Sequence, residues 1–247
     1  MIELMEVTKV YKGGVKAVDN LNFSVNSGEL FGFIGPNGAG KTTTIKMMVG
    51  LLEPTSGSVK IDGYDVKTNP LDVKKRIAYV PDDPNVYEKL TGLEYLNFIA
   101  DVYNVPSTVR KERMERLLNV FEMTSSVGSL IESYSHGMRQ KIILIGALLH
   151  DPSVWILDEP MVGLDPRAAF ELKTMMREHC EQGHTVFFST HVLEVAEKLC
   201  DRIGIIDKGH LIACGTLDEL RHGQQNESLE QLFLQLTDAT AEGTESE

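Results

Sequence analysis

The segment at residues 35–42 has the residue types and spacing of a phosphate-binding loop. It reads GPNGAGKT, which fits the pattern G-x-x-x-x-G-K-[ST], and it follows an apolar run and opens a helix-forming stretch. Glycines let the backbone curl so that successive N–H groups face an anion, and a helix N-terminus adds positive potential. The alternative, a plain turn between a strand and a helix, requires neither Lys41 nor Thr42 nor so many glycines.

The side chains of this loop predict how phosphate groups are held. Lys41 supplies a point charge between the β- and γ-phosphates, and Thr42 places its hydroxyl on magnesium. The other expected contacts are Gly35, Asn37, Gly38, Ala39, Gly40 and Thr43. We therefore expect a nucleotide site that uses Mg²⁺, and we count Lys41 among its catalytic residues.

Two carboxylates follow the apolar run at residues 154–157. Strands of an open α/β sheet present ligand-binding residues at their carboxyl ends, so Asp158 and Glu159 are expected at that edge. Asp158 is the candidate to hold magnesium, and Glu159 the candidate to orient or deprotonate the attacking water. An acidic cap on the following helix is the alternative for Glu159 taken alone.

His191 follows a second apolar run, at residues 185–189, and is expected to reach the same edge of the sheet. A lone histidine is usually structural. Its place at the end of a core strand, in a chain that already has a phosphate site, favours a contact with the γ-phosphate.

The elements around these residues predict an α/β fold. Strand-like runs fall at residues 2–7, 17–25, 30–34, 58–61, 154–157, 185–189 and 202–206, and helical stretches at 42–49, 137–149, 167–181, 192–199, 216–221 and 229–236. Between about 85 and 123 the periodicity is helical, with a capping box at Thr91 and Glu94. The alternation of strands and helices predicts a largely parallel sheet flanked by helices, and the acidic tail at 238–247 is expected to be disordered.

Composition excludes several function classes. The chain has 247 residues and a formal charge of −12, which argues against a nucleic-acid partner. The longest apolar run, residues 142–149, is well short of the roughly 20 residues that cross a bilayer. The N-terminus lacks the pattern of a signal peptide, so we expect a cytoplasmic protein.

Over residues 2–236 the order of these motifs resembles the ATP-binding subunit of an ABC transporter. The residues Gly163-Leu164-Asp165 look like that family's D-loop, His191 like its switch histidine, and Tyr11 like the aromatic that stacks on adenine. The resemblance implies a P-loop NTPase (RecA-like) core within residues 1–237. It also implies an N-terminal antiparallel β-subdomain and a helical subdomain inserted at about 85–150, with ATP and Mg²⁺ as ligands.

The chain departs from the family pattern at two places. The signature, usually LSGGQ, reads YSHGM at residues 134–138, which keeps Ser135 and Gly137 but replaces a glycine by His136. Ser135 and Gly137 still suit a phosphate contact at a helix N-terminus. Asp82 stands where the family commonly has glutamine, and an ionised carboxylate cannot donate a hydrogen bond. A plain turn at residues 81–84 is the alternative for Asp82.

The family resemblance also implies partners. Two ATP-binding subunits, identical or different, would face each other head to tail, and a transmembrane permease on a separate chain would be gripped near Asp82 and residues 85–123. The segments at 215–220 and 227–237 look most like bacterial ABC-2-type exporters, which places the chain on the inner face of the cell membrane. Two alternatives remain open: a soluble ABC-type ATPase that acts on ribosomes or DNA, and an ATP-gated regulatory module with weak hydrolysis.

Overall fold

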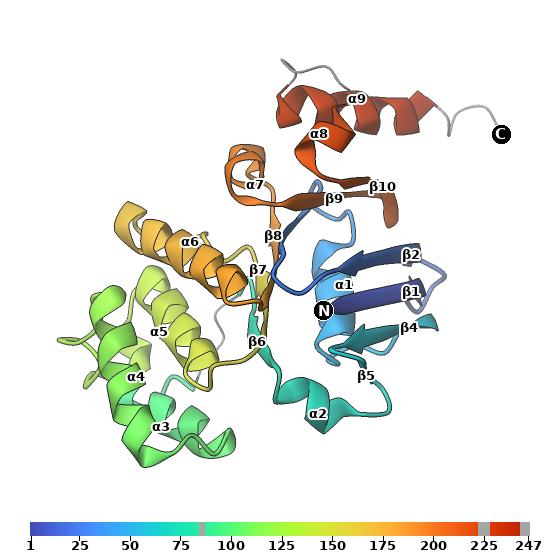
Figure 1. Ribbon diagram of the computed structural model, residues 1–247. Helices are drawn as coiled ribbons and strands as arrows, with labels where there is room; N and C mark the ends of the chain where they lie inside the picture. Colours follow the sequence, from blue (N-terminus) through green and yellow to red (C-terminus); the bar gives the residue numbers. More distant parts are fainter. Residues whose placement is uncertain (84–86, 222–227, 243–247) are drawn as a thin grey trace.

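The computed structural model describes residues 1–83, 87–221 and 228–242, and it contains two sheets (Figure 1). The smaller sheet is antiparallel, with strand order β2-β1-β4-β5. Its strands are β1 (Ile2–Val10), β2 (Lys16–Val25), β4 (Ser56–Ile61) and β5 (Tyr64–Asp65). Ile2, Leu4 and Val7 of β1 are buried, and the alternation at the start of this strand gives the sheet one apolar face.

The larger sheet has six strands in the order β10-β9-β3-β8-β7-β6. These are β3 (Leu30–Ile34), β6 (Ile77–Val80), β7 (Val154–Asp158), β8 (Thr185–Thr190), β9 (Arg202–Asp207) and β10 (His210–Gly215). All neighbours pair in parallel except β9 and β10. The largely parallel sheet and the antiparallel N-terminal sheet expected from the sequence are thus confirmed; β10, a short antiparallel edge strand, was not expected.

Side chains on the two faces of the parallel sheet enter different cores. Ile156 and Phe187 face the antiparallel sheet and helix α1 (Lys41–Met48), whereas Leu157 and Phe188 face the helices. Burial on both faces explains why these strands read as continuous apolar runs rather than as alternating ones. It also fixes the strands rigidly, so that the loops at their carboxyl ends hold definite positions.

The helices lie mainly on the side of the parallel sheet away from the antiparallel sheet (Figure 1). Between β6 and β7 come α3 (Gly92–Val102), α4 (Ser107–Val120), a 3-10 turn (Ile131–Ser133) and α5 (His136–Leu148). The capping box at Thr91 and Glu94 is present at the start of α3. The other helices are α2 (Pro70–Lys74), α6 (Pro166–Glu181), α7 (Leu193–Leu199), α8 (Leu217–Leu220) and α9 (Leu229–Glu242).

The C-terminal helix corrects one expectation from composition. Helix α9 runs to Glu242, so residues 238–242 of the acidic tail are helical, while 243–247 lie outside the described residues. Leu229 and Leu232 are buried in a small core with Ile203 and Ile205 of β9. Because this packing supplies the helix nucleus, adding residues at its end requires no further nucleation. No helix in the described parts of the chain is long and apolar enough to span a bilayer.

Candidate functional site

The glycine-rich loop joins the end of β3 to the start of α1 at the carboxyl edge of the parallel sheet. Gly40, the residue before the helix, has φ 110°, and a methyl group there would lie 2.6 Å from the carbonyl oxygen of Ala17. A methyl group at Gly35 would lie 2.2 Å from the carbonyl oxygen of Ile206. Only glycine fits at these two positions, so close packing explains the glycines independently of any ligand.

Lys41 is buried within this loop. Its Nζ donates hydrogen bonds to the carbonyl oxygens of Gly35 (2.7 Å) and Pro36 (3.2 Å), and it lies 3.9 Å from Glu159 Oε1. Burial lowers the pKa of Lys41, and the carboxylates of Glu159 and Asp158 oppose that shift. The ammonium group is therefore anchored by the loop and faces the acidic residues at the end of β7.

A cavity of about 180 Å³ lies over the loop. Its walls are Ala17, Pro36, Asn37, Gly38, Gly40, Lys41, Thr42, Thr43, Asp82 and Glu159. Most of the expected phosphate contacts thus meet at one place, although Gly35 and Ala39 are buried and do not line the cavity. Asp82 comes from the far side, where the chain leaves β6.

Asp158 ends β7 and is buried. Ser189 of β8 donates from its hydroxyl to Asp158 Oδ1 at 2.6 Å, whereas Asp158 Oδ2 is buried without a hydrogen-bond partner in the described structure. A buried carboxylate oxygen without a partner is unusual and suits a hard cation such as Mg²⁺. Thr42, whose hydroxyl is the other expected ligand, is exposed at the cavity. These two oxygen donors fit magnesium, which usually takes its remaining ligands from water and phosphate.

Glu159 is held next to Asp158 in a strained conformation. It has φ 48°, and its backbone N–H donates to the Ser189 hydroxyl at 3.0 Å. Only 11% of its side chain is exposed. Positive φ in a residue other than glycine persists only where surrounding contacts enforce it, and such strain is common at functional sites. The Ser189 hydroxyl, which contacts both acidic residues, supplies part of that constraint.

The helix-cap interpretation of Glu159 is wrong. Helix α6 begins at Pro166 and is capped by Asp165, whose side chain accepts a hydrogen bond from the N–H of Ala168 at 3.0 Å. The carboxylate of Glu159 instead faces His191 and Lys41. Its position therefore leaves it available for chemistry at the cavity.

His191 reaches the same edge from the end of β8. Its Nδ1 lies 3.0 Å from Glu159 Oε2, and the side chain is 54% exposed. The N–H of Val192 donates to Thr190 Oγ1 at 3.0 Å, which orders the turn that carries the histidine. The structure thus brings His191 into contact with Glu159, which lines the phosphate cavity together with Lys41, although His191 itself is not part of the cavity wall.

Tyr11 lies near the loop but outside the cavity wall. Its hydroxyl is 3.4 Å from Thr43 Oγ1, and the residue is 41% exposed. An exposed aromatic face beside the phosphate loop is compatible with stacking on a base. The expected contact with adenine stays a prediction.

The signature residues lie elsewhere. Ser135 caps α5 and accepts a hydrogen bond from the N–H of Met138 at 3.3 Å, and neither Ser135 nor Gly137 lines the phosphate cavity of this chain. Ser135 and Gly137 therefore lie apart from the phosphate loop of their own chain, which is compatible with the head-to-tail pairing of two subunits that the family resemblance implies.

Sequence reasoning missed two residues of this site. Ser189, which holds both acidic residues, is the last residue but one of β8, and no motif marks it. Ala17, at the start of β2, lines the cavity from the antiparallel sheet. The sequence offers one signal for Ser189, which is a polar residue near the carboxyl end of a buried strand. It offers no such signal for Ala17.

A phosphate loop after a parallel strand, with paired carboxylates at the same edge two strands away, defines a P-loop nucleoside triphosphatase. The model of the ABC transporter family matches residues 18–162. The chain belongs to this family and is an ATPase.

Relatives and solved structures agree with this membership. The probable multidrug ABC transporter ATP-binding protein YbhF of Escherichia coli (strain K12) is 37% identical over 96% of this chain, and the chain spans 41% of that protein's length. An ATP-binding subunit of an ABC transporter superposes with a TM-score of 0.92 at 36% identity, covering 96% of this chain and 99% of the other. The dimeric ATP-binding cassette MJ0796 in a post-hydrolysis state with ADP and Pi gives 0.79 at 26% identity, over 88% of this chain and 99% of that one.

Proposed function

We propose that this chain hydrolyses ATP in a site shared between two ATP-binding subunits and thereby drives a separate transmembrane permease. The observation that carries the proposal is the carboxylate of Glu159, which lies between His191 and Lys41 at the rim of the phosphate cavity. The carboxylate of Glu159 can polarise water, the imidazole of His191 can position it, and the ammonium group of Lys41 is held by the loop. Water needs groups of these kinds in order to attack a γ-phosphate.

In this proposal the side chains have distinct roles. The loop N–H groups and Lys41 bind the β- and γ-phosphates, and Tyr11 stacks on the adenine. Thr42 and Asp158 hold Mg²⁺, which neutralises phosphate charge when it is bound. Glu159 orients the attacking water and accepts its proton, while His191 contacts the γ-phosphate and orients Glu159. Asp82 faces the same space and contacts water or the metal.

The shared site is supported by the position of the signature segment. Ser135 and Gly137 lie at the N-terminus of α5, away from the phosphate cavity of their own chain, so they can contact a γ-phosphate only on a second subunit. The dimeric relative bound to ADP and Pi supports such pairing. ATP would then join the two subunits, and phosphate release would separate them.

An apolar groove supports the permease as partner. A cavity of about 230 Å³ lies between the parallel sheet and the helices after β6, with Tyr79, Tyr95 and Tyr103 in its wall. Nearby, Tyr87 and Phe98 are exposed and pack edge to face with ring centroids 5.5 Å apart. Exposed aromatic residues beside a groove are typical of a docking surface. The chain would act on the inner face of the membrane, and the multidrug relative favours export.

Hydrolysis is tested with Glu159→Gln. The amide keeps the size of the side chain but cannot accept a proton, so turnover should fall by about 10²-fold or more. ATP should still bind, because Lys41 and the loop are intact, and the variant should accumulate as an ATP-bound dimer in size-exclusion chromatography. Unchanged phosphate release would contradict the role of Glu159.

The partner is tested by affinity isolation from detergent-solubilised membranes. The proposal expects a polytopic membrane protein to be recovered with the tagged chain. Substitution of Phe98 by Asp, in the exposed aromatic pair, should abolish recovery and leave the ATPase rate unchanged. Recovery of ribosomes in place of a membrane protein would favour the soluble alternative.

A further inference from the structure

The unusual residue of the signature segment packs on the loop that follows Glu159. His136 is the first residue of α5, and its imidazole lies over the α-carbon of Gly163. A methyl group on Gly163 would lie 2.5 Å from His136 Cδ2 and 2.9 Å from His136 Nε2. Since real carbon atoms do not approach so closely, the imidazole occupies the space that any side chain at Gly163 would need.

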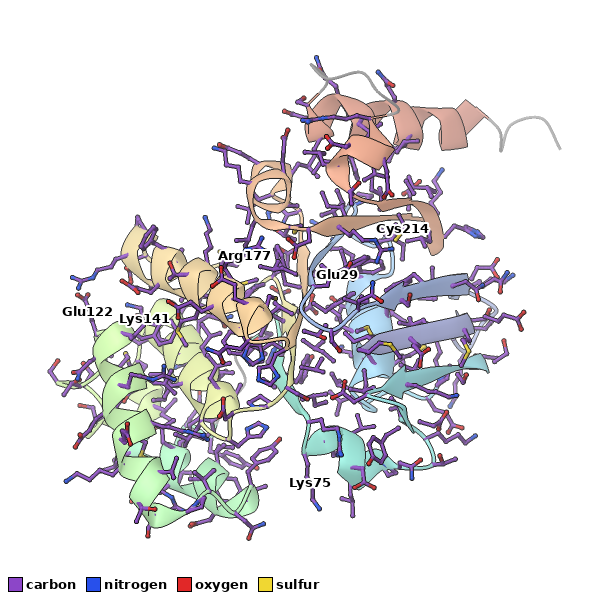
Figure 2. All side chains as sticks on the ribbon, viewed as in Figure 1. Glu29, Lys75, Glu122, Lys141, Arg177 and Cys214 are labelled. Atoms are coloured by element: carbon purple, nitrogen blue, oxygen red, sulfur yellow. The ribbon has the colours of Figure 1, made fainter. Side chains whose placement is uncertain are left out.

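The two segments interlock from both sides. A methyl group on Gly137 would lie 2.5 Å from the carbonyl oxygen of Gly163, so the backbone of the loop fills the space beside Gly137. One helical turn further along α5 is Lys141, which is labelled in Figure 2. It forms an ion pair with Asp165 at 2.5 Å. The N-terminal turns of α5 and the loop ahead of α6 therefore contact each other at two points, one by close packing and one by an ion pair.

Backbone hydrogen bonds connect this contact to Glu159. The N–H of Val162 donates to the carbonyl oxygen of Glu159 at 3.1 Å, and the N–H of Leu164 donates to that of Met161 at 3.3 Å. Two successive turns thus span the residues between Glu159 and Asp165. A shift of Gly163 would be passed to the backbone of Glu159, whose positive φ already depends on its surroundings.

We propose that His136 is a positioning residue for hydrolysis, because its imidazole packs on Gly163 and thereby holds the loop that orients Glu159. The inference rests on the proposed role of Glu159 as the residue that activates water. It does not require a contact between His136 and a phosphate. The histidine that replaces a signature glycine then has a structural role, because its planar ring packs against Gly163, which has φ 79°.

The first experiment compares His136→Ala with His136→Phe in the full chain, with Ser107→Ala at the first position of α4 as the matched control. His136→Ala removes the ring and should lower kcat about tenfold, because displacements of an ångström or less at catalytic groups have effects of this size or more. KM for ATP should stay within about twofold, since the phosphate loop is untouched. His136→Phe restores a planar ring and should recover most of kcat.

A direct contact between His136 and phosphate gives a different pattern. In that case His136→Ala would raise KM or weaken dimer formation with ATP, and the phenylalanine variant would not recover activity because it has no N–H group to donate. That result would overturn the proposal, as would a kcat for His136→Ala equal to that of the wild type and of Ser107→Ala.

A double-mutant cycle tests the contact itself. Gly163→Ala places a methyl group against the imidazole and also strains a backbone with positive φ. It should therefore lower kcat by more than the backbone strain alone would. In the His136→Ala background the ring is absent, so the same substitution should cost several-fold less. Additive effects would overturn the proposal. The kcat values of the wild type and of Glu159→Gln are measured in parallel. If the two values are equal, the proposed role of Glu159 is wrong. If Glu159→Gln shows the expected loss of turnover, a contrary result in the cycle concerns the role of His136 alone.

Discussion

His191 Nδ1 lies 3.0 Å from Glu159 Oε2, and the two residues come from the ends of different parallel strands. The pairing orients the carboxylate toward the phosphate cavity from one side, while Lys41 Nζ, 3.9 Å from Oε1, faces it from the other. Each oxygen of the carboxylate therefore has its own cationic or hydrogen-bonding neighbour.

Replacing His191 by alanine should lower kcat about 10²-fold and change KM for ATP little. In the proposed mechanism the imidazole positions Glu159 and the γ-phosphate, whereas ground-state binding depends mainly on the loop and Lys41. Steady-state phosphate release over a range of ATP concentrations measures both constants. His210→Ala is the matched control, because His210 is a similarly exposed histidine near a carboxylate, with Nε2 3.7 Å from Asp19 Oδ2. Equal rates for the two variants would contradict the role of His191.

Replacing Asp82 by asparagine should tighten ATP binding in the presence of a chelator. Asp82 lines the phosphate cavity, so its charge repels the phosphates when no Mg²⁺ is bound. At the distances across such a cavity the expected gain is about two- to fivefold in Kd, and it should shrink as salt is added. Titration with a fluorescent ATP analogue in EDTA measures it.

The control for this prediction is Asp83→Asn, which changes the net charge equally but alters a residue that does not line the described cavity. A similar gain for both variants would show a general effect of net charge. Weaker binding by Asp82→Asn would indicate that the carboxylate contacts the nucleotide favourably.

Replacing Asp165 by alanine should destabilise the protein by about 1–2 kcal/mol, the usual cost of a lost helix cap. The same change leaves Lys141, which is 12% exposed, without its ionic partner. Asp165→Asn keeps an acceptor for the N–H of Ala168 and should cost less. Urea denaturation of the three proteins at pH 7 measures the difference, and equal midpoints would contradict the dual role of Asp165.

The ion pair also predicts a pH dependence. The hydrogen bond from Lys141 lowers the pKa of Asp165 to about 2. Because the folded-state pKa lies below the unfolded value near 3.8, this contribution is present at neutral pH and is lost as the pH falls from about 4 to 2. The difference in stability between wild type and Asp165→Asn should therefore shrink over that interval.

The parts of the site that could be predicted from the sequence are those encoded locally. The loop around Lys41 and the pair Asp158 and Glu159 each combine a motif with an apolar strand, so pattern and position agree within a few residues. The fold could be predicted for the same reason, since strands buried on both faces give apolar runs that are easy to recognise. Even the capping box at Thr91 is a local signal.

The parts that could not be predicted depend on contacts between distant segments. Ser189 reaches Asp158 from a neighbouring strand, and His136 meets Gly163 only because α5 and the loop before α6 pack together. Nothing in the sequence near either residue records its partner. In the sequence His136 is only a departure from the family signature, whereas in the structure its ring packs on Gly163.

A half-buried histidine outside the nucleotide site predicts the acid sensitivity of the fold. His150 stacks on Tyr103 with ring centroids 3.7 Å apart, and its Nε2 lies 3.2 Å from the carbonyl oxygen of Ile77. Burial lowers the pKa of His150 to about 4, despite the neighbouring Asp151, while Arg113 adds to the shift. The folded protein therefore keeps this side chain neutral where the unfolded chain binds a proton.

The sign of the effect follows from proton binding. Between about pH 6.5 and 4 the unfolded state holds the extra proton, so stability falls as the pH falls, by at most about 1.4 kcal/mol per pH unit for this group. His150→Phe keeps a ring against Tyr103 but cannot titrate, and should flatten the dependence of Tm on pH in that interval. Part of the slope should remain, because burial also lowers the pKa of His179 to about 4. His210→Phe, at an exposed position, should leave the slope unchanged, and a slope for His150→Phe as steep as that of the wild type would show that His150 titrates normally in the folded protein.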